Sequence, residues 1–107
     1  MSESKTYNKL VRDNIPDIIR SNGDSCEVEI LDDKEFLKQL DIKLNEEVAE
    51  YQESKSAEEI ADIIEVLMSI AEARGYAWQE IIKIQLTKRM DRGGFKKKLF
   101  LKTTTEL

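Results

Sequence analysis

KLNEEVAEYQESKSAEEIAD, residues 43–62, is the stretch that decides the fold. Two groups of acidic residues flank the short polar break Ser54-Lys55-Ser56. On both sides of the break, apolar residues recur every three or four positions, as one buried helix face requires. A connection this short makes two helices antiparallel neighbours. The sequence therefore predicts a helical hairpin formed by residues 32–52 and residues 56–74.

Shorter elements are predicted on either side of this hairpin. Pro16 favours the first turn of a short helix, which Gly23 can stop, and a further helix is predicted over residues 77–90. Residues 26–31 alternate between polar and apolar side chains, and residues 98–102 are a second candidate strand. The predicted fold class is a mainly α helical bundle with a small two-stranded β flap.

The length of the chain limits how much apolar surface it can bury. Its 107 residues fit one domain, residues 1–107, with loose ends at residues 1–6 and 103–107. A domain of this size buries only part of its apolar surface. We therefore expect a homodimer or higher homo-oligomer to complete the bundle.

The composition excludes several kinds of site. Hydrophobic residues make up 40% and charged residues 36% of the chain, and the net charge is -5. This acidic balance argues against stable nucleic-acid binding. There is no histidine and one cysteine, Cys26, so imidazole zinc sites, histidine-activated nucleophiles and an internal disulfide are excluded. The polar start MSESKTYNKL and the lack of a membrane-length apolar run predict a cytoplasmic protein.

The acidic residues of the hairpin are spaced to share a face. Glu47 and Glu50 lie three apart on the first helix, and Glu59 and Asp62 lie three apart on the second. If the hairpin is symmetric about its turn, Glu50 faces Glu59 and Glu47 faces Asp62. Four converging carboxylates repel one another and favour a hard divalent cation with oxygen ligands, which fits Mg²⁺ or Mn²⁺ better than zinc or copper.

A solvated acidic face is the alternative to a metal site. Acidic residues also suit the first turn of a helix, and Ser56 with Glu59 matches a capping box. One feature favours the site: the acidic positions border the apolar seam, where the small residues Ala49 and Ala61 permit close helix approach.

Basic residues form two further candidate elements. Arg92 opens the segment RGGF, and Lys88 and Lys96 flank it, so backbone amides and cations can bind phosphate there. A helix stop followed by a solvated lysine run explains the same residues. Lys9 and Arg12 near the N-terminus can either bind phosphate or pair with the acidic groove.

Together these segments resemble one family, the MazG-like all-α nucleoside triphosphate pyrophosphohydrolases, in particular the small single-domain branch similar to phosphoribosyl-ATP pyrophosphohydrolase. The family signature is E-x-x-D after E-E-x-x-E, which Glu46, Glu47, Glu50, Glu59 and Asp62 match. The segments that carry the resemblance, in order over nearly the whole chain, are YNKLVRD (7–13), Ile15-Pro16, KLNEEVAE (43–50), EEIAD (58–62) and RGGF (92–95). Only eight residues separate Glu50 from Glu59, fewer than in many relatives, which bears on substrate choice.

The resemblance implies magnesium-dependent hydrolysis of a nucleoside triphosphate to the monophosphate and pyrophosphate, in an oligomer whose active site uses helices from both subunits. In this interpretation Glu47, Glu50, Glu59 and Asp62 bind the metal. Glu46 or Glu47 acts on the attacking water, with Glu46 as the candidate base. The residues predicted to hold substrate phosphates are Lys9, Arg12, Lys88, Arg92 and Lys96.

A non-catalytic helical module that binds nucleotide or protein is the alternative function. The sequence leaves the base and sugar of the substrate open, and both noncanonical nucleotides and phosphoribosyl-ATP fit the interpretation.

Overall fold

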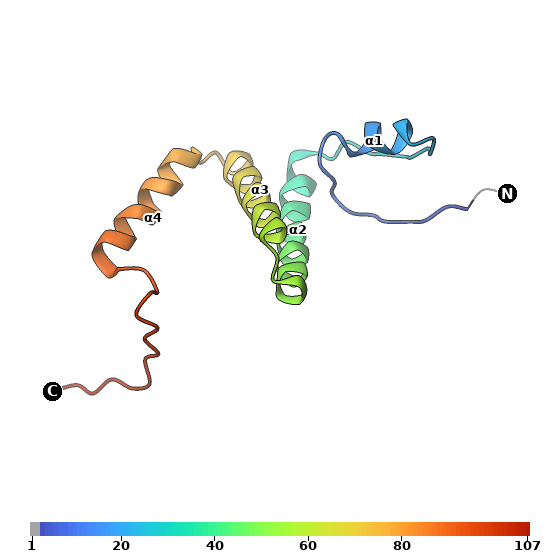
Figure 1. Cartoon of the computed structure of the whole chain (residues 1–107). Coiled ribbons are helices and arrows are strands. Elements are labelled where there is room, and N and C mark those ends of the chain that lie inside the picture. The colour runs from blue at the N-terminus through green and yellow to red at the C-terminus, as the bar shows by residue number, and fades with distance from the viewer. Residues whose placement is uncertain (1–2) are drawn as a thin grey trace. The chain divides into compact units, whose positions relative to one another are not determined.

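The computed structural model describes residues 3–107, and within them the chain has four helices and no strand (Figure 1). The mainly α class predicted from the sequence is confirmed. The chain forms two compact units, one ending at Gly75 and the other spanning Tyr76–Leu107. The helices are α1 (Ile15–Ser21), α2 (Asp33–Ser54) and α3 (Ala57–Ala73) in the first unit, and α4 (Trp78–Arg92) in the second.

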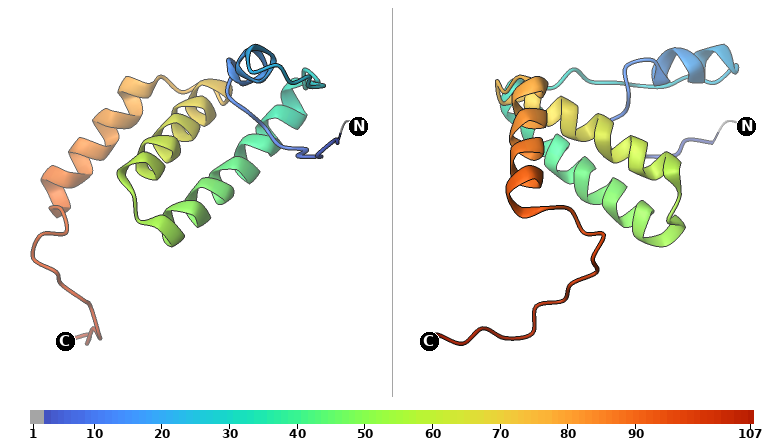
Figure 2. Two further views of the ribbon diagram at one scale, coloured as in Figure 1. Left: turned by 45° about the vertical axis from the view of Figure 1, so that its right-hand side comes forward. Right: turned by 60° about the vertical axis from the view of Figure 1, so that its left-hand side comes forward.

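Helices α2 and α3 form the predicted antiparallel hairpin (Figure 2). Lys55 ends α2 in the left-handed region, at φ 55°, and its N–H donates to the Tyr51 carbonyl at 2.8 Å. Ser56 then caps α3, its hydroxyl accepting from the Glu59 N–H at 3.3 Å. The hairpin is closed by this local chemistry, so its register follows from the sequence at the turn.

The other helix ends also follow local signals. Pro16 occupies the first turn of α1, and Gly23 follows its C-terminal end with φ 90°. Helix α4 ends where Gly93 adopts φ 85°, two residues later than predicted. Within residues 3–107, no helix is both long enough and apolar enough to cross a membrane.

The hairpin buries little apolar surface. Its most buried hydrophobic residues are Leu40, Val66 and Ala71. Four apolar side chains on one face of α3 are 38–47% exposed, and we call this set the α3 stripe: Ile60, Ile64, Leu67 and Met68. Because these positions recur at helical spacing, they form a continuous apolar surface beside the face packed on α2.

The predicted β flap is wrong: neither residues 26–31 nor residues 98–102 form a strand. Alternating side chains indicate an extended segment, but a strand also needs a partner for its backbone groups. The side chain of Ile30 is 97% exposed, and the Lys98 N–H donates to the Phe95 carbonyl at 3.0 Å in a local turn. At the predicted loose ends, residues 3–6 and 103–107 are exposed and without regular structure, and residues 1–2 lie outside the described residues.

Replacing Asp32 with alanine is expected to lower the free energy of unfolding by about 1 kcal/mol. The Asp32 side chain caps α2 by accepting a hydrogen bond from the Glu35 N–H at 2.8 Å, and alanine removes that acceptor. Urea denaturation measures the loss. Asp32→Asn keeps a capping oxygen and should stay close to wild type, so equal losses in both variants would contradict the assignment of the cap.

Candidate metal centre

Three glutamates converge where the hairpin closes. Glu47 and Glu50 project from one face of α2, and Glu59 projects from the first turn of α3. One carboxylate oxygen from each lies within 4.8 Å of those of the other two. Glu47 is only 6% exposed, an unusual position for a charged residue. The structure therefore brings together three of the four residues predicted to bind a metal.

Two carboxylate oxygens in this cluster are buried without a partner. Glu47 Oε2 and Glu59 Oε2 have no hydrogen-bond partner within the part of the chain that the structure describes. A buried polar oxygen left unpaired carries its full desolvation penalty. A hard divalent cation among the three side chains would satisfy both oxygens. The donor set, all carboxylate oxygen, suits Mg²⁺ or Mn²⁺.

The capping-box alternative for Glu59 does not hold for its side chain. In a capping box the residue at this position reaches back to the backbone N–H of the cap residue. Here the Ser56 N–H donates instead to the Ser54 hydroxyl at 3.2 Å. Only the backbone N–H of Glu59 takes part in the cap, so its carboxylate is available to the cluster.

Crowding raises the pKa of two of the glutamates. Loss of hydration, followed by interactions with Glu47 and Glu50, raises the pKa of Glu59 from 4.5 to about 7. The pKa of Glu50 is also raised, chiefly by hydrogen bonding with Glu47 and by the negative charge of that residue. Both shifts mean that the ionised cluster is unfavourable without a compensating positive charge.

Asp62, the fourth predicted ligand, pairs with the N-terminal segment. Its Oδ1 accepts a hydrogen bond from Arg12 Nη2 at 2.7 Å, and it lies outside the set of three glutamates. Sequence spacing places Asp62 on the same helix face as Glu59, but spacing alone does not show a partner 50 residues away. Its role as a metal ligand stays a prediction.

The N-terminal basic residues face the acidic hairpin. Lys9 Nζ lies 3.5 Å from Glu46 Oε1, and Arg12 pairs with Asp62 as described. Of the two interpretations of Lys9 and Arg12, pairing with the acidic groove is therefore the one observed. Both pairs are partly exposed, so their contribution to stability is small.

Lys43 is a member of the site that the sequence analysis missed. Its Nζ lies 3.5 Å from Glu46 Oε1 and 3.3 Å from Glu47 Oε1, and its side chain is 17% exposed. The signal was present in the sequence, because Lys43 lies three and four residues before these glutamates on one helix. It neutralises one side of Glu47 and leaves Oε2 unpaired.

The remaining predicted phosphate-binding residues lie in the second unit. Lys88, Arg92 and Lys96 line one pocket at the end of α4, together with Arg89, which the sequence analysis did not select. Their predicted contact with substrate phosphates stays a prediction.

The metal-free protein is expected to become less stable between about pH 5 and pH 7.5. In the folded protein the pKa of Glu59 is about 7, above its ordinary 4.5. Ionisation of Glu59 therefore favours the unfolded chain. The protein keeps its full stability below pH 4.5 and loses stability as pH rises through 7. Melting temperatures in EDTA across this range measure the effect. Metal binding requires ionised carboxylates, so the stabilisation by added Mn²⁺ should grow over the same interval.

Glu59→Gln should flatten this pH profile. Glu58→Gln is the matched control, because Glu58 shares the first turn of α3 but lies outside the cluster. If the two variants lose the same pH dependence, a helix-end effect explains the profile and the cluster does not.

Comparison with known proteins gives a partial match. A protein of Mycolicibacterium smegmatis, described only as uncharacterized, is 50% identical over 42 residues. The matched segment spans 39% of this chain and 43% of that protein, so it covers less than half of either. No family model matches the sequence. No solved structure matches it either.

Proposed function

We propose that this chain is a cytoplasmic, divalent-metal-dependent nucleotide pyrophosphohydrolase of the MazG-like type. Its reaction is the hydrolysis of a nucleoside triphosphate, or a related nucleotide such as phosphoribosyl-ATP, to the monophosphate and pyrophosphate. Two things support the proposal: the cluster of Glu47, Glu50 and Glu59, and the ordered resemblance of the motifs to that family.

One observation carries the metal part of the proposal. Glu47 Oε2 and Glu59 Oε2 are buried and unpaired on opposing helices, beside Glu50. A solvated acidic face would have its oxygens in water, and a structural ion pair would give them cationic partners. A divalent cation held between the two helices would satisfy both oxygens at once.

Glu47, Glu50 and Glu59 would hold the ion, with Asp62 as a further ligand if Arg12 releases it. A bound Mg²⁺ supplies charge neutralisation for the phosphate oxygens and the departing pyrophosphate. Water attacks the α-phosphorus, the bond from this phosphorus to the bridging oxygen of the β-phosphate breaks, and pyrophosphate leaves with the electron pair.

Glu46 is the proposed acceptor of the proton from the attacking water. Its ion pairs with Lys9 and Lys43 engage only Oε1, so Oε2 can accept a proton. The side chain is 28% exposed at the rim of the cluster, where water has access.

The proposal includes self-association through the α3 stripe. A two-helix hairpin with so few buried apolar side chains does not form a complete bundle, and two hairpins packed together would. A second copy of the chain would cover Ile60, Ile64, Leu67 and Met68 with the same residues.

A panel of nucleotides tests the activity. Canonical and noncanonical nucleoside triphosphates and phosphoribosyl-ATP are incubated with the protein in Mg²⁺ or in EDTA, and monophosphate and pyrophosphate are quantified. Equal amounts of both products, from at least one substrate and only with metal, are expected. If Mn²⁺ raises the melting temperature but no substrate is cleaved, the non-catalytic binding module is correct instead.

A further inference from the structure

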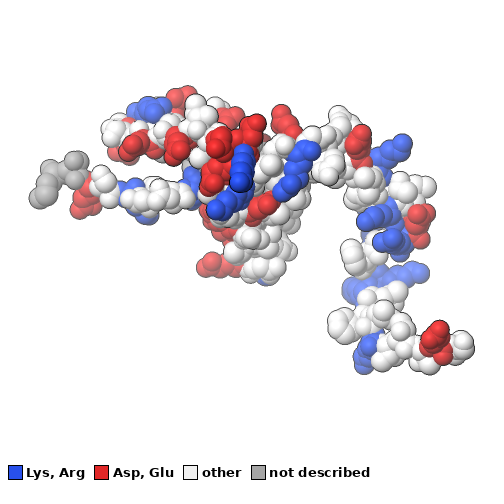
Figure 3. Space-filling model, turned by 180° about the vertical axis from the view of Figure 1, so that it is seen from behind, with Lys and Arg blue, Asp and Glu red and all other residues white. Residues whose placement is uncertain are grey.

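The two compact units carry opposite net charges. Residues 76–107 contain eight Lys and Arg against three Asp and Glu, a net charge of +5. The rest of the chain contains nine basic and nineteen acidic residues, a net charge of -10. Figure 3 shows the blue basic side chains along α4 and the segment after it. The chain is acidic as a whole but contains a basic unit. The acidic net charge therefore does not exclude nucleic-acid binding by that unit.

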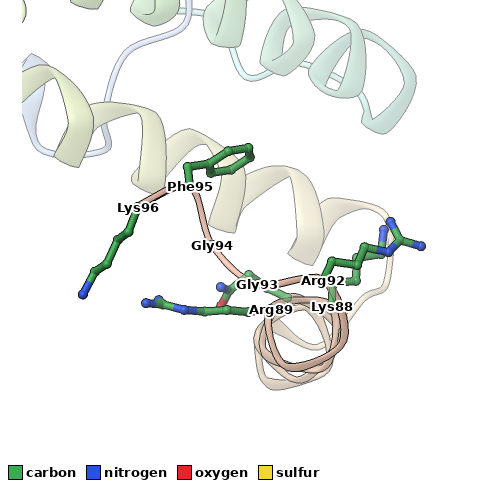
Figure 4. A pocket seen from close by; sticks show the side chains of 8 residues that line it. Lys88, Arg89, Arg92, Gly93, Gly94, Phe95 and Lys96 are labelled. Carbon is green, nitrogen blue, oxygen red and sulfur yellow. The ribbon is translucent and has the colours of Figure 1, made fainter. Parts of the chain in front are cut away.

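Basic residues line one pocket at the end of α4, where Arg89 and Lys96 extend to one side and Lys88 and Arg92 to the other (Figure 4). Four of the lining residues are cationic, Lys88, Arg89 and Arg92 on the helix and Lys96 after it. Within residues 76–107 none of the eight basic side chains forms an ion pair, so their charge is available to a ligand. The pocket volume of about 560 Å³ is in the range of small-molecule sites.

The glycine pair shapes this pocket. Gly93 adopts φ 85° and ψ 179°, a backbone region that is essentially restricted to glycine, while its N–H donates to the Arg89 carbonyl at 2.8 Å. A Cβ on Gly94 would lie 3.9 Å from Arg89 Nε, so the arginine passes close to this backbone. The sharp change of direction after the helix places Phe95 and Lys96 at the pocket with the helical cations.

Aromatic side chains accompany the cations. Phe95 is 97% exposed and Phe100 is 87% exposed, so both rings lie in solvent where a base can stack on them. The positive charge also continues beyond the pocket, through Lys97, Lys98 and Lys102. A free nucleotide needs fewer cations than the pocket and the following lysines supply. A strand with repeated phosphates and unpaired bases matches both the row of cations and the exposed aromatic rings.

We propose that residues 85–102 form a binding site for single-stranded nucleic acid, with the cations on its phosphates and Phe95 stacked on an unpaired base. The site uses no metal and does not rest on the proposed hydrolase activity.

An anionic membrane surface is the competing ligand for such a segment, because Leu99 and Leu101 are also exposed. The backbone favours nucleic acid. Residues 96–102 are not helical, so they do not form the amphipathic helix that lies in a membrane interface.

Fluorescence anisotropy with a labelled 12-nucleotide single strand tests the site, using the full chain in EDTA. We expect binding in 50 mM NaCl and, for about four phosphate contacts, a salt slope of about -2.8, which makes binding about 50-fold weaker in 200 mM NaCl. Phe95→Ala should weaken binding about 5- to 150-fold without changing the slope. The double variant Arg89→Gln/Arg92→Gln should weaken binding and reduce the slope by about 1.4.

Lys34→Gln/Lys38→Gln is the matched control, because it removes the same charge from exposed positions on α2. This variant should bind like wild type. The proposal is overturned if no binding occurs in 50 mM NaCl, or if the two double variants weaken it equally. Tighter binding to a duplex of the same sequence than to the single strand would also overturn the proposal. Binding to phosphatidylserine vesicles without binding to the oligonucleotide would assign the segment to membranes instead.

Discussion

Glu47→Gln is expected to lower the rate of magnesium-dependent pyrophosphate release about 100-fold or more. Substitutions in the outer shell of a metal site already cost about 10–100-fold, and Glu47 is proposed to contact the ion itself. Glutamine keeps one neutral carbonyl oxygen but lacks the negative charge and the second oxygen that the buried carboxylate offers to the ion. The measurement is a steady-state assay at saturating Mg²⁺, with the best substrate from the nucleotide panel.

The same variant should be more stable than wild type in the absence of metal. Glutamine removes one of the mutually repelling charges, and its amide can donate to Glu50 or Glu59. The ion pair between Lys43 and Glu47 is lost, but Lys43 keeps its contact with Glu46 Oε1. We expect a gain of about 1 kcal/mol, or roughly 4–8 °C in melting temperature, and no further shift with Mn²⁺. Glu53→Gln, on the same helix but outside the cluster, should change neither activity nor the metal-induced shift. An active Glu47→Gln enzyme would contradict the proposed role of Glu47.

Ile64→Lys is expected to weaken self-association by at least about 30-fold, or about 2 kcal/mol, the value typical of a central interface residue. Ile64 lies within the α3 stripe and is 46% exposed. A lysine there would place a charge in the apolar contact between two hairpins. Sedimentation velocity over a concentration series measures the change, and the wild-type chain should sediment as a dimer or larger species.

Glu65→Lys provides the control for this variant. It also adds a lysine to α3, but at an exposed position that is not one of the four apolar positions of the stripe. It should leave the oligomer intact. If the wild-type chain is monomeric at all concentrations, or if both variants dissociate equally, the α3 stripe is not the contact between copies.

The helices were predictable because their ends are decided by nearby residues. Asp32 and Ser56 each accept a hydrogen bond from a backbone N–H three residues ahead. Helices α2 and α4 each end two residues later than predicted, because the last helical turn carries little sequence signal. The hairpin turn also followed from local sequence, and with it the approach of Glu59 to Glu47 and Glu50.

What could not be predicted depends on contacts between distant segments. The alternation in residues 26–31 is a local property, whereas strand pairing needs a partner that local sequence does not reveal. Likewise, spacing placed Asp62 toward the cluster, but its hydrogen bond with Arg12 joins segments 50 residues apart. Lys43 is a different case, because its spacing to Glu46 and Glu47 was visible in the sequence.

The central claim is that Glu47, Glu50 and Glu59 bind a divalent cation, and a crystal soaked in Mn²⁺ tests it most directly. An anomalous difference map should show a manganese peak bonded to carboxylate oxygens from both α2 and α3, including the side chain of Glu47. If the map shows no peak among these three residues while their carboxylates point into solvent, the metal centre and the hydrolase proposal built on it are wrong.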